Sequence, residues 1–359
     1  MKFDQRIVVP LRREFSDWRL WWSRAVVIAA SIIAGLTVVG FTGLGDRAFE
    51  QFARIEAAWW WAPLLWTPLC AGAIVWLTRR YADAAAGSGI PQVMATLDSS
   101  VDSRQTGLFV SVRLHRAGRP GRRLDLRQRD LLRVDPRPAG RRRGALAGGL
   151  LTAVLSGIAG GLFSRLLLVS LGGRSLDAFT RWRRERPVAF AIGCGLLVAA
   201  IGVVTRGATF GSGYAHTKSM LDGNENEPTV FVLFKFIATW LTAWSGVPAG
   251  IFAPSLSIGA ALGHDVAIWT AYPHATALIA LGMAGFLAAA TQAPLTAFII
   301  VMEMVDGHSM VLSLMACALI ASGVSKLLSR PLYATLAQLQ LDRLPGGRVV
   351  AADDRPAAH

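Results

Sequence analysis

Charged residues are scarce in this chain, and its cysteines are few and isolated. Only 17% of the 359 residues are charged and 53% are hydrophobic, whereas an ordinary soluble domain has about 25% charged residues. This composition argues against a soluble globular protein. Cys70, Cys194 and Cys317 stand singly in apolar segments without the spacing of a disulfide framework or a metal site, so we expect them to fill the core. No nucleophile, base and orienting group occur together at a recognisable spacing, which argues against an enzyme.

Long apolar runs predict a polytopic membrane protein. A helix that crosses a bilayer needs about 20 apolar residues. The candidate spans are 25–44, 60–77, 146–171, 188–204, 229–244, 251–269, 275–290, 294–305 and 309–328. Several are too short to cross alone, as expected where broken helices line an internal cavity. The chain also has 12 tryptophans, which suit the aromatic belts of membrane interfaces.

Basic clusters predict the orientation of these spans. The clusters are Arg12, Arg13, Arg19 and Arg24 before the first span, Arg79 and Arg80 after the second, and Arg181, Arg183, Arg184 and Arg186 in a later loop. The positive-inside rule places all three on the cytoplasmic side, with the N-terminus. We therefore expect a multi-pass protein of a bacterial-type inner membrane. The net charge of +14 is ascribed mainly to this bias and not to a specific nucleic-acid partner.

Residues 101–143 differ from the rest of the chain. They hold thirteen Arg and four Asp, hence a net charge of +9, with no Lys or Glu. Their apolar residues follow neither a helical nor a strand period, which predicts a disordered segment. One interpretation is a basic loop that touches acidic lipid or nucleic acid. The other, which we favour, is a GC-rich gene segment read in the wrong frame, which would yield Arg, Gly, Pro, Asp and Leu without Lys.

Two glycine-rich motifs predict helix starts within the membrane. One is Gly-Ser-Gly-Ile-Pro at residues 87–91, and the other is Gly-Ile-Phe-Ala-Pro at residues 250–254. A helix start leaves backbone N–H groups unpaired and carries about half a positive charge. Two such ends facing one protein-lined cavity would bind a small anion.

Both motifs resemble signatures of the CLC family of chloride channels and proton/chloride antiporters. Two further matches follow in order: Gln-Ala-Pro-Leu-Thr at residues 292–296, which leads into Ile-Ile-Val-Met-Glu-Met at 299–304, and Pro-Leu-Tyr at 331–333. The resemblance covers about 21–97 and 145–344. It implies an all-α, polytopic transmembrane protein of inverted-repeat architecture that moves chloride. It also implies a homodimer in the lipid bilayer, with one pathway per subunit and no cofactor.

The resemblance assigns an anion-binding role to five residues. Ser88 and Gly89 would lie at the first helix start, with Ser88 as the central chloride ligand. Ile251 and Phe252 would act through backbone N–H groups, with Gly250 allowing close approach of the chain, and Tyr333 would close the inner end of the pathway. From the residues alone, Ser88 also suits an ordinary N-cap, Ile251 and Phe252 suit apolar packing, and Tyr333 suits an interfacial belt.

One lysine interrupts an apolar run. Lys235, within 231–236, matches a basic position common in the family. It would either raise the local anion potential or extend its ammonium group to the interface, and the residues alone favour the second.

The chain departs from the family in its first half. The Gly-Arg/Lys-Glu-Gly-Pro segment, whose glutamate gates the pathway and carries protons in antiporters, is missing, so the first repeat is truncated. We therefore expect weak chloride binding at best and no coupled proton transport. Channel and antiporter remain alternatives, because the deciding glutamates would lie in the missing region.

The sequence predicts four segments and leaves two rival functions open. Residues 1–100 hold a cytoplasmic lead and the first spans, 101–143 the arginine-rich segment, 144–344 the remaining spans, and 345–359 a tail. One rival is a transporter for another anion, such as fluoride. The other is a non-transporting membrane protein whose arginine-rich loop binds lipid or RNA.

Overall fold

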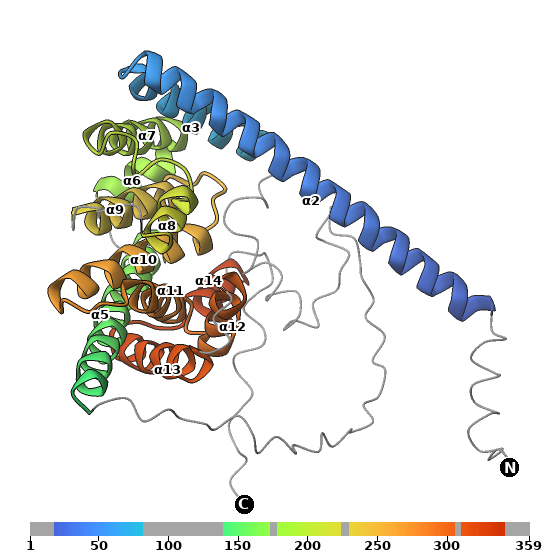
Figure 1. Ribbon diagram of the computed structural model, residues 1–359. Helices are drawn as coiled ribbons and strands as arrows, with labels where there is room; N and C mark the ends of the chain where they lie inside the picture. Colours follow the sequence, from blue (N-terminus) through green and yellow to red (C-terminus); the bar gives the residue numbers. More distant parts are fainter. Residues whose placement is uncertain (1–17, 82–138, 173–177, 224–229, 306–309, 342–359) are drawn as a thin grey trace, which may run out of the picture. The chain divides into compact units, whose positions relative to one another are not determined.

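The computed structural model describes residues 18–81, 139–172, 178–223, 230–305 and 310–341. Every regular element within these ranges is helical, which confirms the all-α prediction (Figure 1). The helices are α2 (Trp18–Ala58), α3 (Ala62–Tyr81), α5 (Ala139–Gly172), α6 (Ala178–Glu185), α7 (Pro187–Val204), α8 (Tyr214–Leu221), α9 (Val230–Ser245), α10 (Phe252–Trp269), α11 (Ala275–Thr291), α12 (Pro294–Met304), α13 (Val311–Leu328) and α14 (Leu332–Leu341). The chain forms two units, Met1–Ala62 and Pro63–His359, which are described separately.

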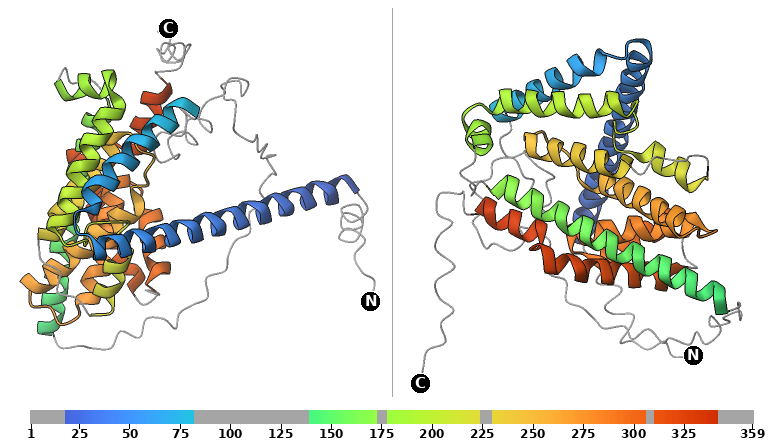
Figure 2. Two further views of the ribbon diagram at one scale, coloured as in Figure 1. Left: turned by 90° about the horizontal axis from the view of Figure 1, so that it is seen from above. Right: turned by 90° about the vertical axis from the view of Figure 1, so that its left-hand side faces the viewer.

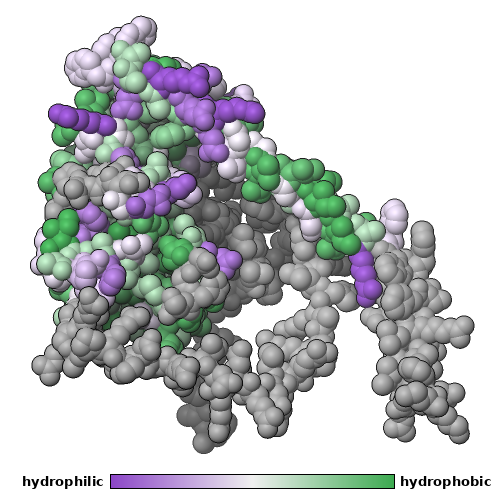
Figure 3. All heavy atoms as spheres, in the orientation of Figure 1, coloured by the Kyte–Doolittle hydropathy of each residue, from purple (hydrophilic) through white to green (hydrophobic). Residues whose placement is uncertain are grey.

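The first unit is built on the single helix α2. Its 41 residues extend well beyond the expected span of 25–44. Hydropathy marks only the part of the helix that is suited to lipid. The helix itself continues through residues that favour helix formation, such as those of 47–58. Large apolar side chains cover much of its surface, with Phe41 79% exposed, and Figure 3 shows a green stretch along the middle of α2. A surface of this kind suits lipid.

In the second unit, the apolar runs become helices with nearly the predicted bounds. α7 and α12 both begin with proline at the first helical position, where the missing N–H costs nothing. Among the described residues, four helices are long and apolar enough to cross a membrane: α2, α5, α7 and α13. The helices α9, α11 and α12 are apolar but have only 16, 17 and 11 residues. This confirms that several predicted spans are too short to cross alone.

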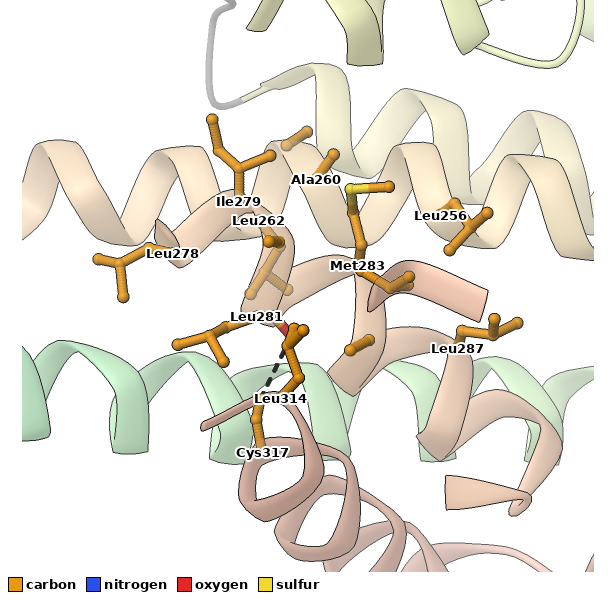
Figure 4. Close-up of a cluster of buried hydrophobic side chains, with 14 of the residues drawn as sticks. Leu256, Ala260, Leu262, Leu278, Ile279, Leu281, Met283, Leu287, Leu314 and Cys317 are labelled. Carbon is orange, nitrogen blue, oxygen red and sulfur yellow. Dashed lines mark hydrogen bonds between the residues drawn. The ribbon is translucent and has the colours of Figure 1, made fainter. Parts of the chain in front are cut away.

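The centre of the second unit is an antiparallel pair formed by α10 and α11. Gly259 lies against Gly282 and Gly263 against Leu278, so the two backbones touch without intervening side chains. Small residues allow this approach, which maximises dispersion contacts where lipid offers no hydrophobic driving force. The cluster of buried side chains in Figure 4 extends from this pair to α13, where Cys317 Sγ donates to the Leu281 carbonyl at 3.2 Å. Cys317 is therefore the core filler that the sequence predicts.

The long helix α5 lies alongside α13 and covers α11 (Figure 2). Glycines again set the spacing. A Cβ on Gly160 would lie 2.6 Å from the Ala289 Cβ, and one on Gly157 would lie 2.7 Å from the Val324 Cβ. Two buried hydroxyls bond locally or across this contact, since Thr152 donates to the carbonyl four residues earlier and Ser164 donates to the Ala290 carbonyl at 2.7 Å. The buried Oγ atoms of Ser156 in α5 and Ser322 in α13 have no hydrogen-bond partner among the described residues.

The structure tests the predicted bounds of two basic segments of the chain. The basic connection containing Arg181–Arg186 lies between two candidate spans, as predicted, and it includes the short helix α6, which the sequence did not predict. An eight-residue amphipathic helix is too short for a reliable periodic signal. The proposed boundary at residues 100 and 101 lies outside the described residues, and α5 begins at Ala139, within the last five residues of the arginine-rich segment.

Candidate anion-binding site

The structure brings together three of the five predicted site residues. Ile251 and Phe252 lie at the start of α10, and Tyr333 is the second residue of α14. The rings of Phe252 and Tyr333 stack with centroids 6.1 Å apart and an interplanar angle of 21°. Ser88 and Gly89 lie outside the described residues, so their role stays a prediction.

A glycine-rich connection leads from α9 to the site. Gly246 follows the last residue of α9 with a φ of +88°, a conformation that glycine adopts without the steric cost of a Cβ. Ser245 fixes the turn, because its Oγ donates to the Thr242 carbonyl at 2.7 Å and accepts from the Val247 N–H at 3.2 Å. The chain thus leaves α9 sharply and reaches Ile251 within a few residues.

The start of α10 has free hydrogen-bond donors. Ser255 uses both its N–H and its Oγ to donate to the Ile251 carbonyl, at 3.0 and 2.6 Å. No described side chain caps this helix start, and the N–H groups of Ile251, Phe252 and Ala253 have no acceptor among the described residues. Pro254 has no N–H to satisfy. The helix dipole adds partial positive charge at the same place, so an anion would be favoured there.

Open space adjoins these donors. Gly250 is exposed, and a Cβ added to it would meet no described atom within 4 Å. The expected close approach of the chain to an anion at Gly250 stays a prediction. The described protein leaves room at Gly250, which directly precedes Ile251 and Phe252 in the chain.

Tyr333 is held by the core. Its side chain is 7% exposed and belongs to a buried cluster contributed by α5, α10, α11 and α14. This burial excludes the alternative interpretation of Tyr333 as an exposed interfacial tyrosine. Ile251 is buried in the same cluster, so its side chain packs while its backbone N–H faces the helix start. Both roles proposed for Ile251 from the sequence are therefore compatible.

Gln292 orders the approach to α14, a role that the sequence did not reveal. It caps α11 with a φ of +56°, which allows the tight turn into α12. Its Nε2 donates to the Ser329 carbonyl at 2.9 Å, just before α14 begins, and nearby Ser325 Oγ donates to the Ala289 carbonyl at 2.6 Å. Gln292 is thus a positioning residue for the segment that carries Tyr333. Pro294, two residues later, signals only the start of α12 and not this contact.

Lys235 does not take the interfacial role that the residues alone favour, and its effect on the local anion potential stays a prediction. It is 2% exposed, so its side chain does not extend to the interface. Its Nζ donates to the Thr209 and Gly211 carbonyls, each at 2.9 Å, and thereby holds the turn before α8. The same turn is fixed to α10, because Ser257 Oγ donates to the Gly213 carbonyl at 3.4 Å. The lysine buries a positive charge near the first turns of α10 without pairing it with a described carboxylate.

Replacing Lys235 with methionine should loosen this turn. The Thr209 carbonyl is buried, and losing its donor would leave it unsatisfied at a cost of about 1–3 kcal/mol. We expect hydrogen exchange of the amides in 207–213 to accelerate by roughly tenfold. The matched change Lys218→Met removes an exposed lysine of α8 and should leave exchange unchanged. Equal exchange in the wild type and in Lys235→Met would refute the role of the ammonium group.

The described residues supply donors for an anion and no constellation for a metal. No group of three His, Cys, Asp or Glu side chains within the described ranges could hold a metal ion. What the geometry offers is an uncapped helix start, an open approach at Gly250 and a tyrosine stacked against the first residue of the helix.

Part of this chain is similar in sequence to known chloride transport proteins. Proteins named H(+)/Cl(-) exchange transporter ClcA are 29% identical over 224 residues in Yersinia pestis and 31% identical over 219 residues in Cronobacter sakazakii. These alignments cover 58% and 57% of this chain, and 45% of each relative. The chain thus spans about half the length of the curated relatives that it matches. A solved structure described as a eukaryotic CLC transporter aligns with a TM-score of 0.43 at 20% identity, over 57% of this chain and 36% of that one.

The family model described as voltage gated chloride channel matches residues 142–326. The matched range includes Ile251 and Phe252, begins after Ser88 and ends before Tyr333. It also contains the helix pair α10 and α11 and the whole of the connection from α9. A match over more than half of the chain shows its family: this protein belongs to the voltage gated chloride channel family.

Proposed function

We propose that this protein binds chloride at the start of α10 and moves it across the membrane. The observation that supports the proposal is the stacking of the Tyr333 ring on that of Phe252, the first residue of a helix whose start has no side-chain cap. Ser88 and Gly89 would complete the site from the first glycine-rich motif. The relatives' name, H(+)/Cl(-) exchange transporter, supports transport, not catalysis, as the activity, and chloride as the ion.

The energetics favour a weak site. Taking an ion out of water costs several kcal/mol even after the protein relaxes. A helix start returns about 0.3–1 kcal/mol, or about 2 kcal/mol when partly buried. The start of α10 is therefore insufficient alone, and binding depends on the hydroxyl groups of Ser88 and Tyr333. Each of these supplies a hydrogen bond to a charged acceptor, which contributes about 1.5–3 kcal/mol.

Chloride movement by this protein is not expected to be coupled to protons. The sequence holds no Gly-Arg/Lys-Glu-Gly-Pro segment, so the gating glutamate of the family has no counterpart at that motif. A pathway without this carboxylate lacks its outer proton carrier. We propose that chloride movement, where it occurs, is passive.

The membrane location and the oligomeric state are also proposed from the sequence and the family resemblance. We propose a multi-pass protein of a bacterial-type inner membrane with a cytoplasmic N-terminus, supported by the apolar helices and by the arginines around the first two spans. The family resemblance supports a homodimer with one pathway per subunit. Light scattering in detergent would then give a protein mass of twice 38.5 kDa.

Chloride efflux from vesicles that contain the purified chain tests the proposal. We expect efflux above that of empty vesicles, without accompanying proton movement. The changes Ser88→Ala and Tyr333→Phe each remove one hydroxyl donor and should lower the efflux about tenfold, which corresponds to losing about 1.4 kcal/mol of ion stabilisation.

Three outcomes would count against the proposal. Efflux no greater than that of empty vesicles would refute transport, and unchanged efflux in both variants would refute the site. Faster movement of fluoride than of chloride would favour the alternative anion. Both variants change only a hydroxyl group, so wild-type thermal unfolding would confirm that the fold is retained.

A further inference from the structure

Helix α6 joins the ends of two candidate membrane spans. The span within α5 ends at Gly172, and the span α7 begins at Pro187. Because these two ends are connected by a short stretch of chain, they lie on the same side of the membrane, and α6 lies at that surface. Figure 2 shows α6 as a short green helix at one end of α7.

The inner face of α6 is anchored by aromatic side chains. The ring of Trp182 packs edge-on against Phe190 of α7, with centroids 5.4 Å apart, and Phe179 contacts Trp244 of α9 at 6.2 Å. On the same face, Arg183 Nη1 makes a long hydrogen bond of 3.4 Å to the Ser170 carbonyl in the last turn of α5. Three helices of the unit thus fix the position and orientation of α6.

The outer face of α6 is basic. At 100° per residue, Arg181 and Arg184 project from the side opposite Phe179 and Trp182. Both are exposed, as is Arg186, which immediately precedes α7. Among the described residues, these three guanidinium groups have no acceptor, and Glu185 forms no ion pair with them. Four arginines and one glutamate give 178–186 a net charge of +3.

We propose that the outer face of α6 binds the phosphate headgroups of anionic phospholipids. A guanidinium group presents two parallel N–H donors that match a phosphate. An amphipathic helix with arginine on one face and Trp and Phe on the other is typical of the membrane interface. The aromatic anchors hold the arginines at the edge of the spans, where lipid phosphates also lie. This position favours a lipid headgroup over free phosphate or nucleic acid.

Native mass spectrometry of the full chain in detergent tests this proposal. The probes are phosphatidylglycerol and phosphatidylcholine with identical acyl chains. We expect tighter binding of phosphatidylglycerol, and a loss of roughly twentyfold in Arg181→Gln/Arg184→Gln, since each basic residue near a membrane surface contributes about fivefold. Phosphatidylcholine binding should not change, which also shows that the variant is folded. The double variant Arg181→Lys/Arg184→Lys should retain part of the preference for phosphatidylglycerol, because lysine keeps the positive charge but lacks the planar guanidinium group.

The matched control is Arg206→Gln/Lys218→Gln. It removes the same charge from exposed positions beyond the opposite end of α7, so phosphatidylglycerol binding should be unchanged. An equal loss in this control would overturn the proposal in favour of overall charge. Displacement of the lipid by inorganic phosphate at the same concentration would overturn it in favour of a free-anion site. Tighter binding of an RNA oligonucleotide would overturn it in favour of nucleic acid.

Discussion

Replacing Gly282 with alanine should destabilise the protein by about 1–3 kcal/mol, although it adds a single methyl group. The added Cβ would overlap the Gly259 carbonyl oxygen and would lie 2.9 Å from the Gly263 backbone nitrogen. Both obstacles are backbone atoms of α10, so no change of side-chain rotamer can relieve the overlap. The central helix pair would have to separate, and the dispersion contacts between the two backbones would weaken.

Gly323→Ala is the matched control for this prediction. Gly323 lies within α13, is exposed, and would have nothing within 4 Å of an added Cβ. The same chemical change should stabilise that helix by about 0.5–1 kcal/mol, because alanine is the better helix former. Chemical unfolding in detergent, followed by tryptophan fluorescence, measures both effects. Similar stabilities of the two variants would contradict the close contact of α10 and α11.

Replacing Gly250 with valine should reduce chloride efflux at least about tenfold and leave the fold intact. The position is exposed, its φ lies outside the left-handed region, and a side chain there would meet no described atom within 4 Å. The valine methyl groups would instead fill the space before the Ile251 and Phe252 amides and hinder the approach of the ion. A loss of about 1.4 kcal/mol of ion stabilisation accounts for a tenfold effect.

The control for Gly250→Val is Gly323→Val, at another exposed glycine with open surroundings that is remote in sequence from the start of α10. Its efflux should match that of the wild type. Gly250→Val should unfold at the wild-type temperature, which separates an effect on the site from an effect on the fold. Undiminished efflux in Gly250→Val would show that chloride does not pass this helix start.

Much of the helical framework was predictable from hydropathy, because each apolar run had to satisfy its backbone within a helix. Proline is the first residue of both α7 and α12, at positions 187 and 294, a position that suits it. The extent of α2 was missed, since helix propensity continues where hydropathy stops. The helix α6 was missed because its eight residues are mostly polar, and its aromatic anchors act only through contacts with α7 and α9.

The anion-binding site was predictable only in part, and not from hydropathy. Ile251, Phe252 and Tyr333 were assigned through the family resemblance, and no periodicity in the sequence could have placed α14 against the start of α10. The roles of Lys235 and Gln292 depend on partners 24–26 and 33–37 residues away in the chain. Such partners are fixed by tertiary packing and by turns with positive φ, which local sequence does not specify.

The backbone contact between α10 and α11 also restricts how this protein can move. Sliding α10 along α11 by one turn, about 5.4 Å, would bring residues larger than glycine into the place of Gly259 or Gly263. The two helices must therefore translate and tilt as a single body, and the α10 helix start is carried with them. Any gating rearrangement among the described residues then has to occur at the periphery of this pair, where α14 presents Tyr333.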